Sequence, residues 1–181
     1  AVDVVIATTA QIDDLQKQAH VVPGSQVNLA RVGIGAFVAL GSEKPNLNSV
    51  ESFTRSLSAA KTIAYVDPAI GGASGIYMAS LLDRLGLAAE MKPKSKLFPS
   101  TAALYEGVAS GAADIGFNQI SETLAQPSVQ VADPLPSAIQ HYEQFTAGIS
   151  AGSKQANAGK ELVTFLSSAA AKDLLRIKGF E

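Results

Sequence analysis

Cysteine is absent from this sequence of 181 residues, which excludes disulfide bonds, cysteine nucleophiles and thiolate metal sites. Tryptophan is absent as well, so little stacking on aromatic side chains is available for binding. Only two histidines occur, His20 and His141, and their separation fits neither a metal site nor a Ser-His-Asp triad. We therefore expect no metal, no cofactor and no catalytic residue of these kinds.

Neither sign of charge predominates in the sequence, and long apolar runs are also lacking. The net charge is -2 and no block of like charges occurs, so the sequence gives no reason to expect nucleic acid as a partner. No apolar run is long enough to span a membrane. Hydrophobic residues make up 47% and charged residues 17% of the chain, which is ample for a buried core. No targeting segment is visible before the first residue, Ala1.

Short β-branched or aromatic runs alternate with helical patterns throughout the chain, which predicts an α/β fold with mostly parallel strand pairing. We expect strands at 2–7, 31–40, 62–66, 113–118, 129–132 and 145–150. Helices are expected after the caps Thr9, Asn48 (with Glu51) and Ser100, and at 76–85, 158–166 and 170–178. The basic stretch 92–96 is expected to be a solvated connection. In the helices expected at 76–85, 158–166 and 170–178, the predicted inward residues are Ile76, Ala79, Leu82, Leu85, Leu162, Phe165, Leu166, Leu174 and Leu175.

The segment Asp67-Pro68-Ala69-Ile70-Gly71-Gly72-Ala73-Ser74-Gly75-Ile76-Tyr77 is the most informative stretch of the sequence. It joins a predicted strand to a helix start through a glycine-rich turn. Backbone N–H groups at a helix N-terminus lack internal partners, and the helix dipole favours negative charge there. The glycines allow a ligand to approach the backbone, and Ser74 adds a hydroxyl group. The alternative is a tight strand-to-helix connection that binds nothing.

Two further predicted strand ends carry polar, uncharged groups, at Ser100-Thr101 and at Asn118-Gln119. In open α/β sheets, ligands bind beyond the carboxyl ends of the strands. N–H, hydroxyl and amide groups without a dense cluster of cations suit a small anion or a polyoxygenated solute. The alternative treats Ser100 as a plain helix cap and Asn118-Gln119 as a turn.

Six segments in order resemble the type II periplasmic solute-binding proteins of ABC uptake systems, and most nearly the group of molybdate-binding proteins. The segments are AVDVVI at 1–6, LARVGIG at 29–35, DPAIGGASGIY at 67–77, LLDRLGL at 81–87, GVASGAADIG at 107–116, and the ending with Phe165-Leu166 and Lys178-Gly179-Phe180. The resemblance covers nearly the whole chain and implies two lobes, joined by hinge strands, that close on a solute.

The resemblance also sets the expected organisation and location. Residues 1–29 with 146–181 would form part of the first lobe, and residues 30–145 would form the second. In the family, an opening strand and helix precede the strand that corresponds to AVDVVI, so we expect a chain truncated or processed at its N-terminus. The first-lobe sheet would then expose an edge that allows self-association. The implied location is the periplasm, and the implied partners are a small anionic ligand and a membrane ABC permease.

The family's ligand contacts can be carried over by position. The turn donor falls at Ser74, with Gly72, Ala73 and Gly75 beside it, and further contacts fall at Thr101 and Gln119. Gln119 stands where the molybdate binders have tyrosine, and the longer GGASG turn also resembles a periplasmic aconitate isomerase of the same fold. Arg31, near the hinge, could pair with a ligand carboxylate or form a structural salt bridge. For an isomerase, Glu122 would be the nearest carboxylate base, with a helix-start charge as its alternative.

Overall fold

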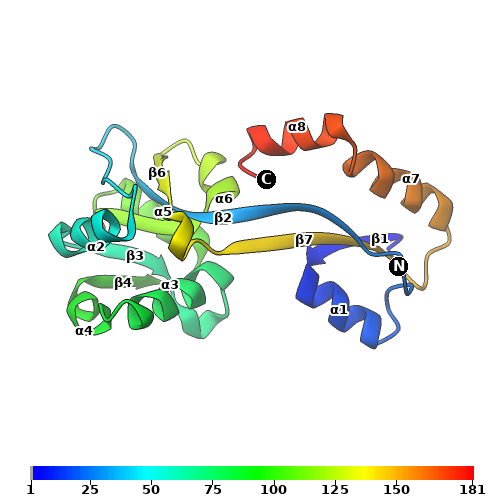
Figure 1. Cartoon of the computed structure of the whole chain (residues 1–181), viewed down its shortest axis with the longest axis horizontal. Helices are drawn as coiled ribbons and strands as arrows, with labels where there is room; N and C mark the ends of the chain where they lie inside the picture. The colour runs from blue at the N-terminus through cyan, green and yellow to red at the C-terminus, as the bar shows by residue number, and fades with distance from the viewer. Residues whose placement is uncertain (1) are drawn as a thin grey trace. The chain divides into compact units, whose positions relative to one another are not determined.

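The computed structural model describes residues 2–181 and divides the chain into two compact units. Unit 1 consists of Ala1–Val32 and Tyr142–Glu181, and unit 2 consists of Gly33–His141. Strand β2 (Val27–Ala39) contributes to both units, whereas β7 (Tyr142–Ile149) belongs to unit 1 (Figure 1). The expected α/β class is confirmed, but the strand pairing is mixed rather than mostly parallel. The lobe boundaries expected from the sequence, after residues 29 and 145, stay a prediction.

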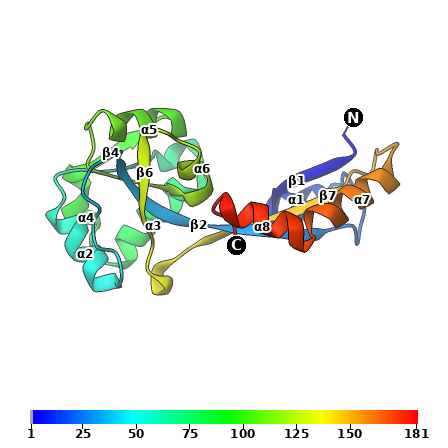
Figure 2. The same ribbon diagram turned by 90° about the horizontal axis from the view of Figure 1, so that it is seen from above.

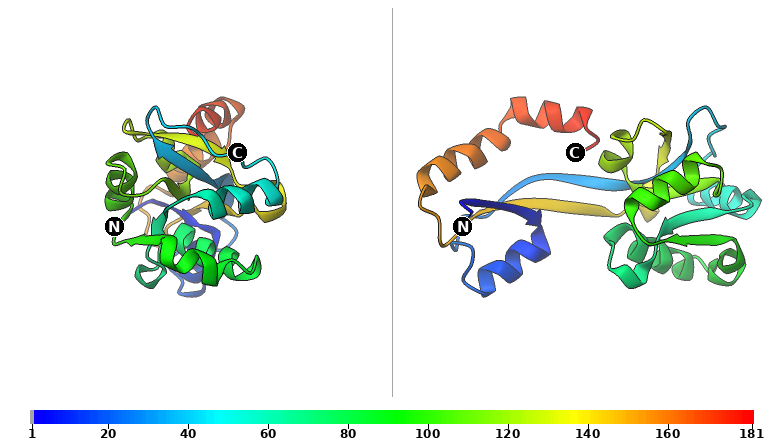
Figure 3. Two further views of the ribbon diagram at one scale, coloured as in Figure 1. Left: turned by 90° about the vertical axis from the view of Figure 1, so that its left-hand side faces the viewer. Right: turned by 180° about the vertical axis from the view of Figure 1, so that it is seen from behind.

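Unit 1 contains a small sheet with helices on it. Its elements besides β2 and β7 are β1 (Val4–Thr8), α1 (Thr9–Lys17), α7 (Ala156–Leu166) and α8 (Ala169–Ile177). Strand β1 pairs antiparallel with β7, Val4 lying opposite Ile149. Strand β7 runs alongside β2 (Figure 3). The cap of α1 is Thr8 rather than Thr9, because Thr8 has the extended backbone and its side chain accepts from the N–H of Gln11.

The expected burial of α7 and α8 is wrong. Leu162 and Phe165 are 46% and 59% exposed, and Leu174 is 63% exposed. Helix α7 buries Gly159 and Val163, and a Cβ added at Gly159 would lie 3.1 Å from both Ile149 and Val4 side chains. With Gly159 and Val163 against the sheet, Phe165 lies on the far side of α7 and Leu162 at the margin of the buried face.

Unit 2 is built on a mixed sheet in which β3 (Ile63–Val66) is central. It pairs in parallel with β4 (Ser95–Phe98) on one side and with β5 (Ile115–Gln119) on the other. Strand β2 pairs antiparallel with β5 and with β6 (Val129–Pro134). Strand β4 was not expected from the sequence, because Lys92, Lys94 and Lys96 in and before it are typical of a solvated segment, and the strand is defined by its backbone pairing with β3.

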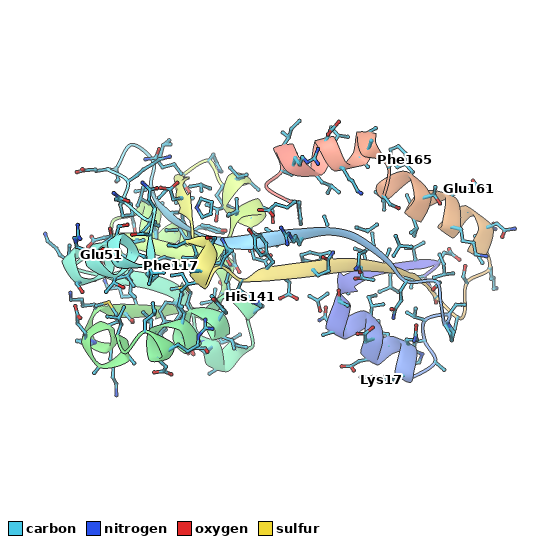
Figure 4. The ribbon with its side chains drawn as sticks, in the orientation of Figure 1. Lys17, Glu51, Phe117, His141, Glu161 and Phe165 are labelled. Atoms are coloured by element: carbon cyan, nitrogen blue, oxygen red, sulfur yellow. The ribbon has the colours of Figure 1, made fainter. Side chains whose placement is uncertain are left out.

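Helices cover both faces of the unit 2 sheet. Helices α2 (Val50–Ala59), α3 (Ala73–Arg84) and α4 (Ala88–Met91) pack on one face, and α5 (Thr101–Ala109) packs on the other (Figure 2). A short helix, α6 (Ile120–Leu124), follows β5, and 3-10 turns lie at Pro68–Ile70, Lys92–Lys94 and Ser137–Ile139. Phe117 on β5 is fully buried between these layers (Figure 4).

Two details of these helices correct the sequence analysis. The cap of α2 is Ser49, paired with Ser52, rather than Asn48 with Glu51, because the extended residue before the helix is Ser49. Helix α3 faces the core with Met78, Leu81 and Leu82, while Ile76 is 49% exposed. Ser100 caps α5 as expected.

Candidate functional site

The ends of three parallel strands meet at one edge of the unit 2 sheet. Val66 of β3 lies opposite Phe98 of β4, and Ile63 of β3 lies opposite Ile115 of β5. The N–H of Asp67 donates to the carbonyl of Phe98 at 2.9 Å, which extends the β3–β4 pairing into the turn. Helices α3, α5 and α6 begin beyond these ends, so the three predicted polar segments all lie at this edge.

The turn before α3 leaves several backbone donors without a protein acceptor. The Asp67 carboxylate accepts from the N–H of Ala69, and Gly71 adopts the left-handed conformation with φ +89°. Gly72 is the N-cap of α3, with no side-chain cap. Within residues 2–181, no acceptor is recorded for the N–H groups of 72–75. Ala73 is exposed and Gly72 half-buried, whereas Ser74 and Gly75 are buried, so only the first residues of this helix start are open to solvent.

Gly75 fixes how closely α3 approaches β3. A Cβ at this position would lie 2.0 Å from the carbonyl oxygen of Val66. A Cβ at Gly72 would lie 3.3 Å from a methyl group of the same valine. The start of α3 therefore rests directly on the end of β3, and position 75 has no room for a side chain.

The Ser74 side chain points into the protein. Ser74 is 6% exposed, and its hydroxyl donates to Oδ1 of Asn118 on β5 at 2.7 Å. Nδ2 of Asn118 in turn donates to Oη of Tyr105 at 2.9 Å and to a carboxylate oxygen of Glu122 at 2.8 Å. The expected turn donor is thus part of an internal hydrogen-bond network that ties α3 to β5, α5 and α6.

Sequence reasoning treated Asn118 as a strand-end donor and overlooked Tyr105. Asn118 is 2% exposed and Tyr105 is 3% exposed, and both belong to this network. Burial, together with the negative charge of Glu122, raises the pKa of Tyr105 above the usual value for tyrosine. The sequence does contain a signal for this network, because Asn118 lies in an otherwise apolar strand and a buried amide requires hydrogen-bond partners.

Thr101 and Gln119 lie at the two neighbouring strand ends. Thr101 is the first residue of α5, and the preceding Ser100 side chain accepts from the N–H of Ala103 at 3.2 Å. Gln119 ends β5 opposite Ile34 and precedes α6, which has no side-chain cap. Both candidate residues are half-buried.

Arg31 belongs to unit 1. Its guanidinium contacts one carboxylate oxygen of Glu181, with Nη2 at 2.8 Å and Nε at 3.2 Å, and it lies 4.1 Å from the centre of the Tyr142 ring. The pair is about half exposed, at 49% and 53%. Beside it lies a cavity of about 290 Å³ that Lys172, Arg176 and Gln144 also line. The structure therefore records Arg31 in a salt bridge within unit 1.

Residues 2–181 contain no group of three or more His, Cys, Asp or Glu side chains that could hold a metal ion. Across the same residues, no helix has the length and apolar character needed to cross a membrane.

A mixed sheet, a strand that contributes to both units and helix starts beyond strand ends are together typical of solute-binding folds. The model of the bacterial extracellular solute-binding protein family matches residues 1–181, so the chain belongs to this family. The chain is similar to the aconitate isomerase of a Pseudomonas species, with 27% identity over 180 residues that cover 99% of this chain and 67% of that protein.

Solved structures show the same fold. A substrate-binding domain assigned to a molybdenum ABC transporter of Clostridium difficile superposes with a TM-score of 0.82 at 20% identity, covering 99% of this chain and 76% of that one. The periplasmic molybdate-binding protein of Azotobacter vinelandii superposes with a TM-score of 0.72 at 20% identity, covering 99% of this chain and 78% of that one. The expected resemblance to type II periplasmic binding proteins is confirmed, and the chain has a solute-binding fold.

Proposed function

We propose that this protein captures a small anion, either a small carboxylate or a molybdate-type oxyanion, in the periplasm and delivers it to a membrane ABC permease. The observation that supports this most is the start of α3, where Gly72 and Ala73 are open to solvent and the N–H groups of 72–75 have no recorded acceptor within residues 2–181. A 12-residue helix places its positive dipole end at these donors. Thr101, Gln119 and Arg31 are proposed as further ligand contacts.

Thermal melting with and without ligand tests this proposal. Molybdate, tungstate, sulfate and aconitate are added separately to the protein. A bound ligand at one hundred times its Kd adds about 2.7 kcal/mol to the unfolding free energy, so the melting temperature rises with concentration. A melting temperature unaffected by all four anions would overturn the proposal.

A pair of proline variants separates the α3 donors from general effects. Ala73→Pro removes one N–H at the first position of α3, where proline is tolerated and the preceding Gly72 is already extended. Ala169→Pro makes the same change at the first position of α8, after the extended Ser168. We expect Ala73→Pro to weaken anion binding and Ala169→Pro to leave it unchanged.

The alternative is an isomerase of a small polycarboxylate. It is favoured by the similarity to an aconitate isomerase over 99% of this chain. Such a reaction needs a base close to the carbon that loses its proton, and the exposed Glu122 carboxylate, hydrogen-bonded to Asn118, is the proposed base. An NMR time course with cis-aconitate or trans-aconitate tests it: conversion that Glu122→Gln abolishes would support it, and no conversion would end it.

Self-association through the edge of β1 is also proposed. Strand β1 ends the strand order, and its only pairing within residues 2–181 is with β7. Unpaired strand edges present free N–H and C=O groups to another chain. Size-exclusion chromatography with light scattering is expected to show a dimer, and a monomer at all concentrations would contradict the proposal.

A further inference from the structure

A cavity of about 260 Å³ lies in unit 2, on the face of the sheet that α3 and α4 cover. It is lined by residues of α3, of α4 and the 3-10 turn that follows it, and of strands β3 and β4. Strand β4 ends the strand order, so one side of the cavity is a sheet edge. The residues that α3 contributes, Ala79, Leu82 and Asp83, belong to the second half of the helix, and none of residues 72–75 lines the cavity.

The floor of this cavity contains a tyrosine hydroxyl without a protein partner. Tyr65 of β3 is 6% exposed, yet no hydrogen bond of its hydroxyl is recorded within residues 2–181. Among these residues, Oγ of Ser95 is the solvent-inaccessible side-chain atom that lacks a partner, and Oη of Tyr65 is not one, so solvent reaches the tyrosine oxygen. Because a hydroxyl in a largely buried side chain requires a partner, Tyr65 offers an unused donor and acceptor to the occupant of the cavity.

The second hydroxyl without a partner belongs to Ser95, the first residue of β4, which also lines the cavity. In the parallel register Ser95 lies opposite Ile63, two residues before Tyr65, so the Ser95 and Tyr65 side chains project from the same face of the sheet. Rotation about the Cα–Cβ bond moves Oγ among three staggered positions, which allows it to meet a ligand group. An unpartnered buried hydroxyl destabilises a protein, and such a ligand group would remove this cost.

Opposite charges lie at the open rim of the same cavity. Asp83, near the end of α3, and Lys92, directly after α4, are both exposed, and neither has a recorded ion pair or side-chain hydrogen bond within residues 2–181. Asp83 lies in the last turn of α3, where the helix dipole adds to its negative potential, so this part of the rim favours an ammonium group. Lys92 favours a carboxylate. Between rim and floor the walls are apolar, formed by Ala79, Leu82, Ala88 and Leu97.

We propose that this cavity binds a free α-amino acid whose side chain ends in a hydrogen-bonding group, with glutamine as the model ligand. The α-ammonium group would contact Asp83 and the α-carboxylate would contact Lys92. The methylene groups would pack between the apolar walls, and the side-chain amide would reach the hydroxyl groups of Tyr65 and Ser95. A cavity of this size suits a molecule smaller than a typical drug. This site is additional to the anion site proposed at the start of α3 and does not depend on it.

Calorimetric titration with glutamine and methionine tests the proposal, because their side chains have similar lengths and differ in the polarity of the tip. We expect glutamine to bind about three- to tenfold more tightly, the effect of one neutral hydrogen bond. Tyr65→Phe should bring this ratio close to one while methionine binding persists. Tyr142→Phe, a change in unit 1 outside the cavity, should leave the ratio unaltered.

The rim is tested with glutaramate, which is glutamine without its α-ammonium group. We expect glutaramate to bind about two- to fivefold more weakly than glutamine, as for a solvent-exposed ion pair. Asp83→Asn should remove most of this difference. A difference that Asp83→Asn leaves in full would contradict the contact between Asp83 and the ammonium group.

Ser95→Ala separates a ligand contact from a structural role. Because Oγ of Ser95 has no partner in the protein, this variant should keep or raise the melting temperature without ligand and lower the affinity for glutamine. Absence of glutamine binding, or a ratio to methionine that Tyr65→Phe leaves unaltered, would overturn the inference and show that the cavity holds water alone. Ala73→Pro, which tests the anion site, should leave glutamine binding unchanged, so the two proposals can fail separately.

Discussion

At the scale of single residues, Gly75 determines how the start of α3 meets the end of β3. Its missing Cβ makes room for the Val66 carbonyl oxygen, which would otherwise lie at 2.0 Å. The glycine-rich turn predicted a close approach of the backbone to a ligand. In the structure, the closest approach at Gly75 is to the protein's own backbone, whereas Gly72 and Ala73 are the more open positions.

Gly75→Ala is expected to lower the unfolding free energy by at least about 2 kcal/mol, because neither the helix start nor the strand carbonyl can move without breaking pairing. Gly152→Ala is the control, since its nearest neighbour is Oγ of Ser150 at 4.0 Å, and it should change stability by about 0.5 kcal/mol or less. Urea denaturation measures both. Equal stabilities of the two variants would contradict the tight contact at position 75.

Tyr105 gives a prediction at alkaline pH. Burial and the Glu122 charge raise the pKa of its hydroxyl, so the folded protein keeps this proton after the unfolded chain loses it. The associated stabilisation is fully present below about pH 10, the ordinary tyrosine pKa, and is lost as the pH rises through the raised value. In absorbance titrations of tyrosinate, Tyr105→Phe should remove a component above pH 10. An unchanged high-pH component would contradict this assignment.

At the scale of elements, the start of α7 depends on a residue far away in the sequence. Asp3 accepts from the hydroxyl of Ser153 at 2.7 Å and from the N–H groups of Lys154 and Gln155 at 3.1 and 3.2 Å. The N-cap residue Gln155 itself provides no side-chain cap. A carboxylate from the segment before β1 thus holds the chain that leads into α7, which no pattern around residues 153–156 could indicate.

These hydrogen bonds, chiefly the one from Ser153, lower the pKa of Asp3. Because the pKa of Asp3 is lowered, its carboxylate stabilises the folded state at pH values above the ordinary pKa near 3.8. This stabilisation is lost as the pH falls through the lowered pKa. Ser153→Ala should raise the pKa of Asp3 toward the ordinary value, as measured by carboxyl NMR titration. An unaltered titration of Asp3 would show that Ser153 does not hold the carboxylate.

At the scale of the whole molecule, the two units differ in how they bury apolar side chains. Unit 2 has clusters of buried residues on both faces of its sheet. Unit 1 has a smaller cluster around Ala147, Ile149 and Val163, and it leaves Phe165, Leu174 and Ile177 exposed, at 59%, 63% and 73%. Exposed apolar groups of this size bind hydrophobic dyes and favour association.

The double variant Leu174→Ser, Ile177→Ser should therefore show lower fluorescence of bound anilinonaphthalene sulfonate in the folded protein. Because both side chains are mostly exposed, the unfolding free energy should change by only about 0.5 kcal/mol per substitution. Lys172→Ser, an exposed change on the same helix, should leave dye binding unchanged. Dye fluorescence that does not fall in the double variant would show that this surface is not the site of dye binding.

Local signals in the sequence were sufficient for much of the fold. The apolar run before Asp67 predicts β3, Ser100 predicts the start of α5, and Gly86 predicts the end of α3, where it adopts φ +70°. Each of these depends on backbone preferences of a few neighbouring residues. The same locality allowed the polar strand ends to be selected as a candidate site.

By itself, the sequence determined the α/β class, the absence of thiol chemistry and the positions of most strands and helix starts, because these follow from composition and short-range periodicity. Only the tertiary structure decided which way side chains face. Gly159 against Ile149 and Val4 sets the rotation of α7, and Asn118, held by Glu122, turns the Ser74 hydroxyl into the protein. Each depends on a contact between residues distant in the chain, Gly159 with Val4 and Ser74 with Asn118, which no local sequence pattern reveals.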